Sequence, residues 1–326
     1  MADTATDQAR TDAGERRGPN GELSSWSDAL LVGVALAYAA LIGFLTFTRG
    51  VDLTPDVLLV AGGFAVAILV RSRFSVLREW MPFLVLFLAY ELMRGLADDV
   101  GFRVHVGDVA GVERFLFGGH LPTALLQGWL HPASGIDWLA VAGTVVYMLH
   151  FILPLATALL LWRVRPNLFH PYLVSLILLS FAGFATYLFL PVAPPWYAAQ
   201  VGLVGTAPGE VAISYLKPGA FADLAGSFGL DGDRLYNVAF TSLNANPVAA
   251  FPSLHAAYPF LTFLVLRRAF GRIGWLAFAY FAFVSFTIVY TADHYVVDVL
   301  GGVIYASAAY GLMWWLARRR LGVART

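Results

Sequence analysis

The sequence predicts an all-α, polytopic membrane protein with about eight transmembrane helices and shorter helices at the membrane interface. Hydrophobic residues make up 59% of the 326-residue chain, and charged residues only 13%. The apolar residues come in long blocks rather than in one-sided helical stripes, which is typical of membrane spans. The formal net charge is zero, so the chain has no net positive charge that would attract nucleic acid. We therefore expect its partners to be membrane lipids.

About eight apolar segments approach the length of roughly 20 residues that crosses a bilayer. The third of them carries Glu91 and Arg94 near its end. If the N-terminus is cytoplasmic, most of the 21 basic residues fall on the inner side, as the positive-inside rule requires. Both termini are then cytoplasmic, and Arg94, His255 and His294 lie near the outer face. The segments are residues 28–47, 55–70, 80–95, 137–161, 169–190, 252–267, 273–291 and 295–316.

Polar stretches flank and connect these segments. Residues 1–27 contain no apolar run, and we expect them to form a disordered cytoplasmic tail. They do not resemble a cleavable signal sequence, so the first helix is expected to be retained. Residues 319–326 form a basic cytoplasmic tail. The two longest connections, 96–136 and 191–251, face outward.

Each outer loop carries features of its own. In the first, Val112–Leu130 is amphipathic but interrupted by a Gly-Gly pair and Pro122, which predicts helices lying along the interface. The second opens with prolines that enforce an extended chain. Its Trp196 and Tyr197 suit the level of lipid headgroups. Because long connections in compact folds are usually functional or disordered, we interpret the second loop as a lid over a site.

The chemistry is predicted for the stretch Phe251–Gly302. His255 and His294 each stand at the start of an apolar helix, and a helix between them returns the chain, so both starts lie on one face. Asp298 follows His294 by four residues, which places both side chains on one helix face. The carboxylate can then accept the imidazole N–H and fix its tautomer. An Asp in an apolar helix costs about 2.5–3.5 kcal/mol, which favours a function. We predict that these three residues are catalytic.

Several other polar residues allow two interpretations. Arg94 either extends to the interface or binds a phosphate through charge-assisted hydrogen bonds. The Ser253 hydroxyl either caps the helix of His255 or donates to a substrate oxygen. We expect Asp293 to be an N-terminal cap, and Gly301 and Gly302 to permit close helix packing. No role is assigned to the remaining histidines, which are His105, His120, His131, His150 and His170.

The motifs resemble a known family. Phe251–His255, Phe-Pro-Ser-Leu-His, and His294-x-x-x-Asp298 are similar to the second and third signatures of the type 2 phosphatidic acid phosphatase superfamily. Pro194-Pro195-Trp196-Tyr197, the long loop that follows and Tyr290–Gly302 look like its inositol phosphorylceramide synthase branch. The resemblance implies a six-helix, lipid-phosphatase-like phosphotransferase core over residues 80–318. Residues 28–79 would then add two N-terminal transmembrane helices. It also implies chemistry without a metal or other cofactor.

The sequence departs from the phosphatases of this superfamily in two of their signatures, which supply cations that bind phosphate. Their first signature, with a Lys and a later Arg-Pro, is absent. Ile288 stands where they carry an Arg, six residues before His294. This loss favours transfer from a phosphodiester over hydrolysis of a phosphomonoester dianion, because a diester has fewer charges to neutralise. Arg94 is a candidate replacement.

The resemblance implies a membrane phosphotransferase that moves inositol phosphate from phosphatidylinositol to an acceptor hydroxyl on a lipid or glycan. His294 would form a phosphohistidine, and His255 would act as acid and then base. Arg94, Ser253, Trp196 and Tyr197 are the candidate substrate-binding residues. Two alternatives remain: a phosphatase acting on phosphatidic acid or an isoprenyl pyrophosphate, and a non-enzymatic lipid-binding or transport protein. The many Ala, Gly and Arg residues beside a single lysine favour a bacterial plasma membrane, and oligomeric state is not indicated.

Overall fold

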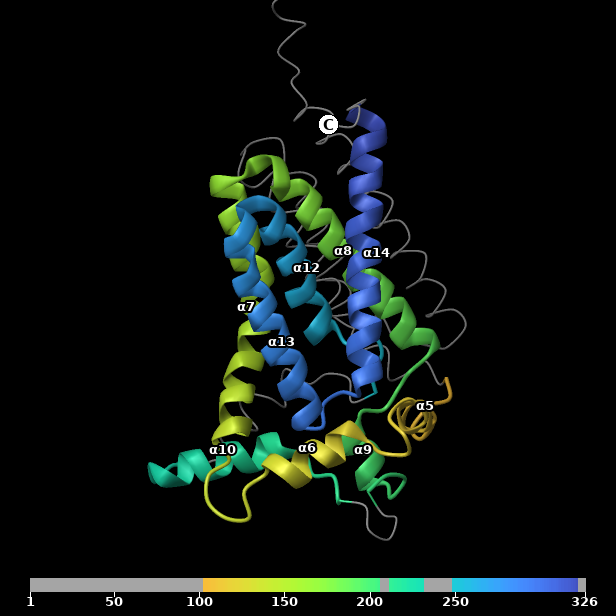
Figure 1. Cartoon of the computed structure of the whole chain (residues 1–326), viewed down its shortest axis with the longest axis vertical. Helices are drawn as coiled ribbons and strands as arrows, with labels where there is room; N and C mark the ends of the chain where they lie inside the picture. The colour runs from red at the N-terminus through yellow and green to blue at the C-terminus, as the bar shows by residue number, and fades with distance from the viewer. Residues whose placement is uncertain (1–101, 206–210, 232–247, 322–326) are drawn as a thin grey trace, which may run out of the picture.

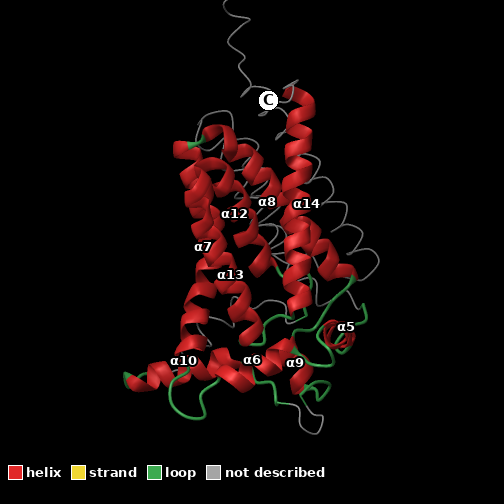
Figure 2. Ribbon diagram, in the orientation of Figure 1, coloured by secondary structure: helices red, strands yellow, loops and turns green. Residues whose placement is uncertain are grey.

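The computed structural model describes residues 102–205, 211–231 and 248–321 (Figure 1). In these ranges the protein is almost entirely helical, with only isolated β-bridges beside the helices (Figure 2). The predicted N-terminal tail, the first three predicted spans and Arg94 lie outside the described residues. Of the predicted C-terminal tail, residues 319–321 belong to the last helix and residues 322–326 lie outside the described residues. The total of eight spans and the two additional N-terminal helices therefore stay predictions.

Long helices form a bundle that matches the last five predicted spans. Among the described residues, three helical segments are long and apolar enough to cross a membrane, or four if the bent α7 counts as one span. The segment Leu254–Tyr290 contains α12 and α13, which are joined by the short turn η3 and pack side by side (Figure 1). The bundle helices are α7 (Trp138–Val164), α8 (Pro166–Phe189), α12 (Leu254–Phe270), α13 (Trp275–Tyr290) and α14 (Val296–Leu321), and η3 is Gly271–Gly274.

Proline and glycine set the bends of the bundle. Helix α7 bends by 47° between Trp138–His150 and Ile152–Val164. Pro154 lies just after the bend, and its ring clashes with the carbonyl four residues earlier, where no amide hydrogen bond can form. Helix α12 ends at Gly271, whose φ of 60° lies in the left-handed region that glycine adopts at low cost.

Four short helices form an outer layer across the end of the bundle where α12 and α14 begin (Figure 1). Helices α5 and α6 come from the first outer loop and are separated by Gly118 and Gly119, both with positive φ. Pro122 opens α6. The two helices expected from the amphipathic stretch are therefore present. The outer layer comprises α5 (Asp108–Leu116), α6 (Pro122–Leu130), α9 (Pro195–Gln200) and α10 (Leu216–Ser227).

Extended segments connect the outer loops to one another. Val192, in the proline-rich opening of the second loop, forms parallel bridges with His105 on one side and Ala249 on the other. The amide of Val192 donates to the carbonyl of Val248 at 2.8 Å, and the amide of Ala250 donates back to Val192 at 3.0 Å. The segment that enters the first histidine motif is thus held by the outer loops.

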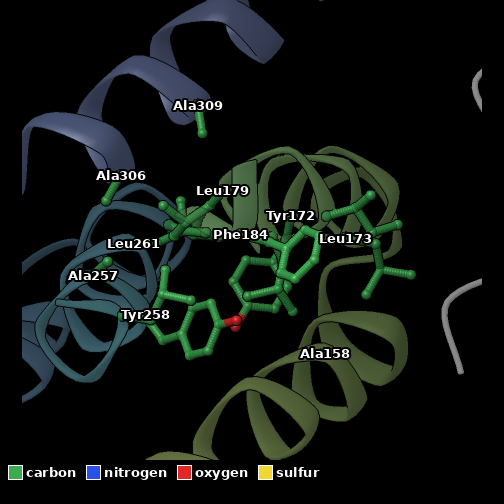
Figure 3. Packing of buried hydrophobic residues seen from close by; sticks show 14 of the residues in the cluster. Ala158, Tyr172, Leu173, Leu179, Phe184, Ala257, Tyr258, Leu261, Ala306 and Ala309 are labelled. Carbon is green, nitrogen blue, oxygen red and sulfur yellow. The ribbon is translucent and has the colours of Figure 1, made fainter. Parts of the chain in front are cut away.

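The largest apolar core lies between α7, α8, α12 and α14 (Figure 3). Leu179 and Leu261 are fully buried there, and Ala306 allows α14 to approach closely. Tyr258 places its hydroxyl 2.8 Å from Ser180 Oγ, so this buried polar group is satisfied. The core packs α12 against α14 and so fixes where each helix begins.

Arginines gather at the end of the bundle that lies away from the outer layer. Helix α7 ends near Arg163, and α12 ends with Arg267 and Arg268 in its last turn. Arg268 lies over the ring of Trp314 at 4.0 Å. The separation of these arginines from the two histidine motifs agrees with the charge pattern expected for an inner face. The orientation in a membrane stays a prediction.

Candidate active site

The two histidine motifs meet at the end of the bundle beside the outer layer. His255 is the second residue of α12, and His294 lies two residues before α14. His255 Nδ1 is 2.9 Å from His294 Nε2, a hydrogen-bond distance. His294 is buried and His255 is partly exposed. The predicted approach of the two imidazoles is confirmed.

Two glycines make this approach possible. A Cβ added to Gly302 would lie 2.4 Å from the carbonyl oxygen of Ser253, and one added to Gly301 would lie 2.5 Å from the Phe251 ring. The amide of Ser253 also donates to the backbone carbonyl of Asp298 at 2.9 Å. The close packing expected of the glycine pair is confirmed, and it presses the start of α14 against the start of α12.

Asp298 approaches His294 by a different local structure from the one expected. His294 precedes the helix, so the two residues do not lie on one helical face. Asp298 Oδ2 instead accepts the amide N–H of Tyr295 at 2.8 Å, as an acidic residue does in the third position of a capping box. The same oxygen is 3.6 Å from His294 Nδ1, just beyond hydrogen-bond range. The carboxylate therefore lies beside Nδ1 of the imidazole, and its role in orienting the ring stays a prediction.

Ser253 is the N-cap of α12. Its hydroxyl oxygen accepts the amide N–H of Ala256 at 3.3 Å, and the residue is fully buried. The predicted cap is therefore confirmed. A contact between this hydroxyl and a substrate stays a prediction.

Aromatic rings from α7 support His255. The Tyr147 ring stacks on the His255 ring, with centroids 4.4 Å apart and planes at 27°. His150 also lies 4.4 Å from His255, and it is 5% exposed. The sequence analysis assigned no role to His150 and did not single out Tyr147. The one available signal was a histidine inside an apolar span.

An ion pair from the outer layer reaches the turn before His294. Lys217 Nζ, in the first turn of α10, is 2.8 Å from Asp293 Oδ1, and the hydroxyl of Thr291 donates to Asp293 Oδ2. The expectation that Asp293 caps α14 is wrong, because two residues separate it from Val296 and its carboxylate faces Lys217. Between Thr291 and Asp293, Ala292 has a φ of 68°, a strained conformation for a residue with a Cβ.

A buried carboxyl group from the outer layer reaches the start of α14. Glu113, on α5, is fully buried, and its Oε1 accepts the amide N–H of Val296 at 3.3 Å. Burial raises the pKa of Glu113 to about 7, with a further upward contribution from the nearby Asp298 carboxylate, while the backbone hydrogen bond from Val296 lowers it. A carboxyl group at this end also complements the helix dipole. Nothing in the sequence pattern singled out Glu113.

The remaining residues predicted to bind substrate are Trp196, Tyr197 and Arg94, and Trp196 directly contacts the turn before His294. Trp196 donates its amide N–H to the carbonyl of Ala292 at 3.1 Å, and its ring stacks on Tyr215 at 5.2 Å. Tyr197 packs edge-on against Trp196. Trp196 thus contacts the turn before His294, while substrate binding by either aromatic residue stays a prediction. Arg94 lies outside the described residues.

The position of the missing phosphatase arginine is apolar in three dimensions. Ile288 is 1% exposed and belongs to a cluster with Tyr147, Ala256 and Val299. Within residues 102–205, 211–231 and 248–321, no three His, Asp or Glu side chains gather as a metal ion would need. The groups that the structure brings together at this end are two imidazoles, a carboxylate and helix N-termini.

These features define a class of protein: an integral membrane enzyme with a histidine pair at one end of an apolar helical bundle. The model of the PAP2 superfamily matches residues 108–312, and the chain belongs to that superfamily. The family resemblance drawn from the motifs is thereby confirmed. No solved structure matches the chain significantly.

The chain is similar to several lipid synthases. The phosphoinositol dihydroceramide synthase of Bacteroides thetaiotaomicron is 30% identical over 253 residues, which cover 72% of this chain and 76% of that protein. The inositol phosphorylceramide synthase catalytic subunit of Schizosaccharomyces pombe is 29% identical over 60% of this chain and 43% of its own. The inositol phosphorylceramide synthase of Candida albicans is 23% identical over 61% and 40%. The match thus spans less than half of these two fungal relatives.

Family and relatives together identify a membrane lipid phosphotransferase similar to inositol phosphorylceramide synthases. An enzyme is supported over a non-enzymatic lipid-binding or transport protein.

Proposed function

We propose that this enzyme transfers inositol phosphate from phosphatidylinositol to an acceptor hydroxyl through a phosphohistidine at His294. The observation that carries the proposal is the 2.9 Å contact between His255 Nδ1 and His294 Nε2. It places an acid–base group and a nucleophile beside each other, where one phosphate can contact both. The nearby Asp298 leaves Nε2 as the reactive nitrogen, because it faces the opposite side of the ring, Nδ1.

In the first step, His294 Nε2 attacks the phosphorus of the donor lipid while His255 is protonated. The P–O bond to diacylglycerol breaks as the N–P bond forms, and His255 gives its proton to the departing oxygen. The proton on His294 Nδ1 faces Asp298, whose negative charge stabilises the positive charge that develops on the ring. The direct contact between the two imidazoles must open to admit the phosphate.

In the second step, the neutral His255 removes the proton from the acceptor hydroxyl. The acceptor oxygen attacks phosphorus, and the bond to His294 breaks, which returns both histidines to their starting states. General acid and base assistance of this kind contributes about 10²–10⁴ in rate. The outer layer covers this end of the bundle (Figure 1) and supports exclusion of water, which transfer requires if it is to compete with hydrolysis.

The charge of the site favours a diester substrate. The N-termini of α12 and α14 both point at the histidine pair and supply partial positive charge. Ile288 adds none at the position where phosphatases of the superfamily carry Arg. A singly charged phosphodiester suits this balance better than a phosphomonoester dianion. The dihydroceramide in the name of the Bacteroides relative makes a ceramide-type lipid the first acceptor to test, with glycan hydroxyls as the second.

The test uses protein reconstituted in liposomes that contain phosphatidylinositol with labelled inositol and a dihydroceramide. We expect label to move to the acceptor lipid in the wild type, and His294→Ala to abolish this transfer. With ³²P-labelled donor, an acid-labile protein adduct should form in the wild type and be absent in His294→Ala.

Two outcomes would overturn the proposal. Turnover of the donor that persists in His294→Ala removes this residue as the nucleophile. Release of free phosphate from phosphatidic acid, with no transfer from phosphatidylinositol to any acceptor, would establish the phosphatase alternative. Asp223→Asn, at an exposed position of α10, is the matched control and should retain full transfer.

A further inference from the structure

The chain has a single lysine, and it is one of the most buried residues in the described part of the molecule. Lys217 is 1% exposed and lies in the first turn of α10. Both features oppose its charge: burial lowers the pKa of Lys217, and the N-terminus of a helix carries partial positive charge. Helix stability therefore gives no reason for a lysine here, and such local conflicts tend to occur at functional sites.

Lys217 contacts two residues, and each of these adjoins one histidine of the pair. On one side its Nζ is 2.8 Å from Asp293 Oδ1, and Asp293 directly precedes His294. On the other side the same atom lies 3.1 Å from the centre of the Tyr147 ring, a close cation–π contact. That ring stacks on His255 at 4.4 Å. One ammonium group thus links the supports of the two imidazoles.

The charge balance decides between binding phosphate and positioning side chains. Lys217 and Asp293 are both nearly buried and form a neutral pair, so the lysine brings little net positive charge to a phosphate. Its value lies in geometry, because a misplacement of about 1 Å between reacting groups can cost about 100-fold in rate. The strained turn at Ala292 adds to the need for an external support.

We propose that Lys217, in the outer layer, is a positioning residue of the active site. By holding Asp293 and the Tyr147 ring together, it sets the distance between His255 and His294. The assignment of catalytic roles to the two histidines rests on the proposed function. The position of the two rings relative to one another does not rest on the proposed function, and it can be measured separately.

The variants separate positioning from folding. Lys217→Met alone leaves Asp293 as an unpaired, nearly buried charge, which is destabilising, so the informative variant is Lys217→Met combined with Asp293→Asn. We expect kcat of this double variant to fall about 10- to 100-fold while KM changes less than about threefold. Lys217→Arg keeps the charge and the stacking ability and should retain kcat within about tenfold of the wild type.

Tyr147 provides the second half of the test. Tyr147→Phe keeps the ring and should retain activity, whereas Tyr147→Leu should lose about as much as the double variant. If one positioning path connects the residues, adding Tyr147→Leu to the double variant will cause little further loss, because coupled contacts are not additive. Asp223→Asn on the same helix is the control for a changed charge on α10.

A spectroscopic measurement gives a result that does not depend on the substrate. Protein labelled with ¹⁵N in its histidines, with signals assigned from His255→Ala and His294→Ala, should show both ring signals shifted in the double variant and unchanged in Asp223→Asn. Wild-type kcat with unchanged ring signals in the double variant would overturn the positioning role. Wild-type protein that transfers nothing from phosphatidylinositol, while the ring signals still shift, would refute the proposed function alone.

Discussion

The helical bundle and the outer layer build the site by different means. In the bundle, aromatic rings and glycines bring His255 to His294 through close packing and one backbone hydrogen bond, from the amide of Ser253 to the carbonyl of Asp298. The outer layer contributes buried titratable groups instead: Lys217 forms an ion pair with Asp293, and the Glu113 carboxyl accepts the amide N–H of Val296. These two contacts hold the segment that contains His294 at both ends.

This difference indicates that the approach of the two imidazoles and the orientation of the His294 segment depend on different parts of the protein. Packing in the bundle decides whether the imidazoles meet, so defects there are expected to reduce both stability and activity. The outer layer decides how the His294 segment is held, so defects there are expected to reduce activity more than stability. The predictions below break or sharpen this distinction.

The largest effect is expected from the histidines themselves. His294→Ala removes the nucleophile and should reduce transfer by at least about 10⁴-fold, whereas His255→Ala removes acid–base assistance and should cost about 10²–10⁴-fold. Initial rates of labelled transfer in liposomes measure both. Thermal unfolding of either variant within a few degrees of the wild type would show that the loss is chemical. Equal activity of His255→Ala and wild type would contradict its role.

Asp298→Asn should come next. The amide oxygen of Asn can still accept the amide N–H of Tyr295, so the turn that begins α14 is kept, but the negative charge beside His294 Nδ1 is lost. We expect kcat to fall about 10²–10⁴-fold with little change in melting temperature. Asp298→Ala loses the cap as well and should also unfold more easily. If Asp298→Asn keeps wild-type kcat, the carboxylate serves only as a cap.

A packing substitution in the bundle should affect stability first. Gly302→Ala places a methyl group 2.4 Å from the backbone carbonyl of Ser253, which has no flexible side chain to yield, and should destabilise by about 3 kcal/mol. Because α14 must shift, transfer should fall in parallel. Gly311→Ala, on the same helix with nothing within 4 Å of its Cβ, is the control and should be neutral or slightly stabilising in urea or thermal unfolding.

The smallest effect is expected from Glu113 and depends on pH. Burial raises the pKa of this carboxyl from its ordinary value of 4.5 to about 7 in the folded chain. Between these values the folded chain holds a proton that the unfolded chain has lost, so this group makes stability fall as pH rises from about 4.5 to 7, by at most about 3 kcal/mol. Glu113→Gln should flatten that part of the stability curve. An unchanged slope would show that Glu113 is ionised when buried.

Much of the bundle was predictable because apolar length and motif spacing are local properties. The five long helices, the break at Gly118 and Gly119, the Ser253 cap and the close packing at Gly302 all follow from residues within one or two helical turns. The meeting of His255 and His294 needed only the reversal of chain direction across one intervening helix.

The errors and omissions involve partners far apart in the chain. Asp293 was expected to cap α14 because helix dipoles favour acids there, but Lys217, 76 positions earlier, forms a stronger contact. Tyr147, His150 and Glu113 carry no motif, and only packing of α7 and α5 against the histidine motifs brings them to the site. Arg94, assigned to phosphate binding as one of two interpretations, lies outside the described residues.

The sequence by itself indicated a helical membrane protein similar to the PAP2 superfamily, and it predicted two histidines and an aspartate as the catalytic residues. Hydrophobic length, glycine placement and short motifs suffice for that, because each acts over a few residues. Only the tertiary structure decided which side chains hold the histidines in place. A buried ion pair or a ring stack depends on which distant surfaces come into contact, and that depends on the packing of all the helices together.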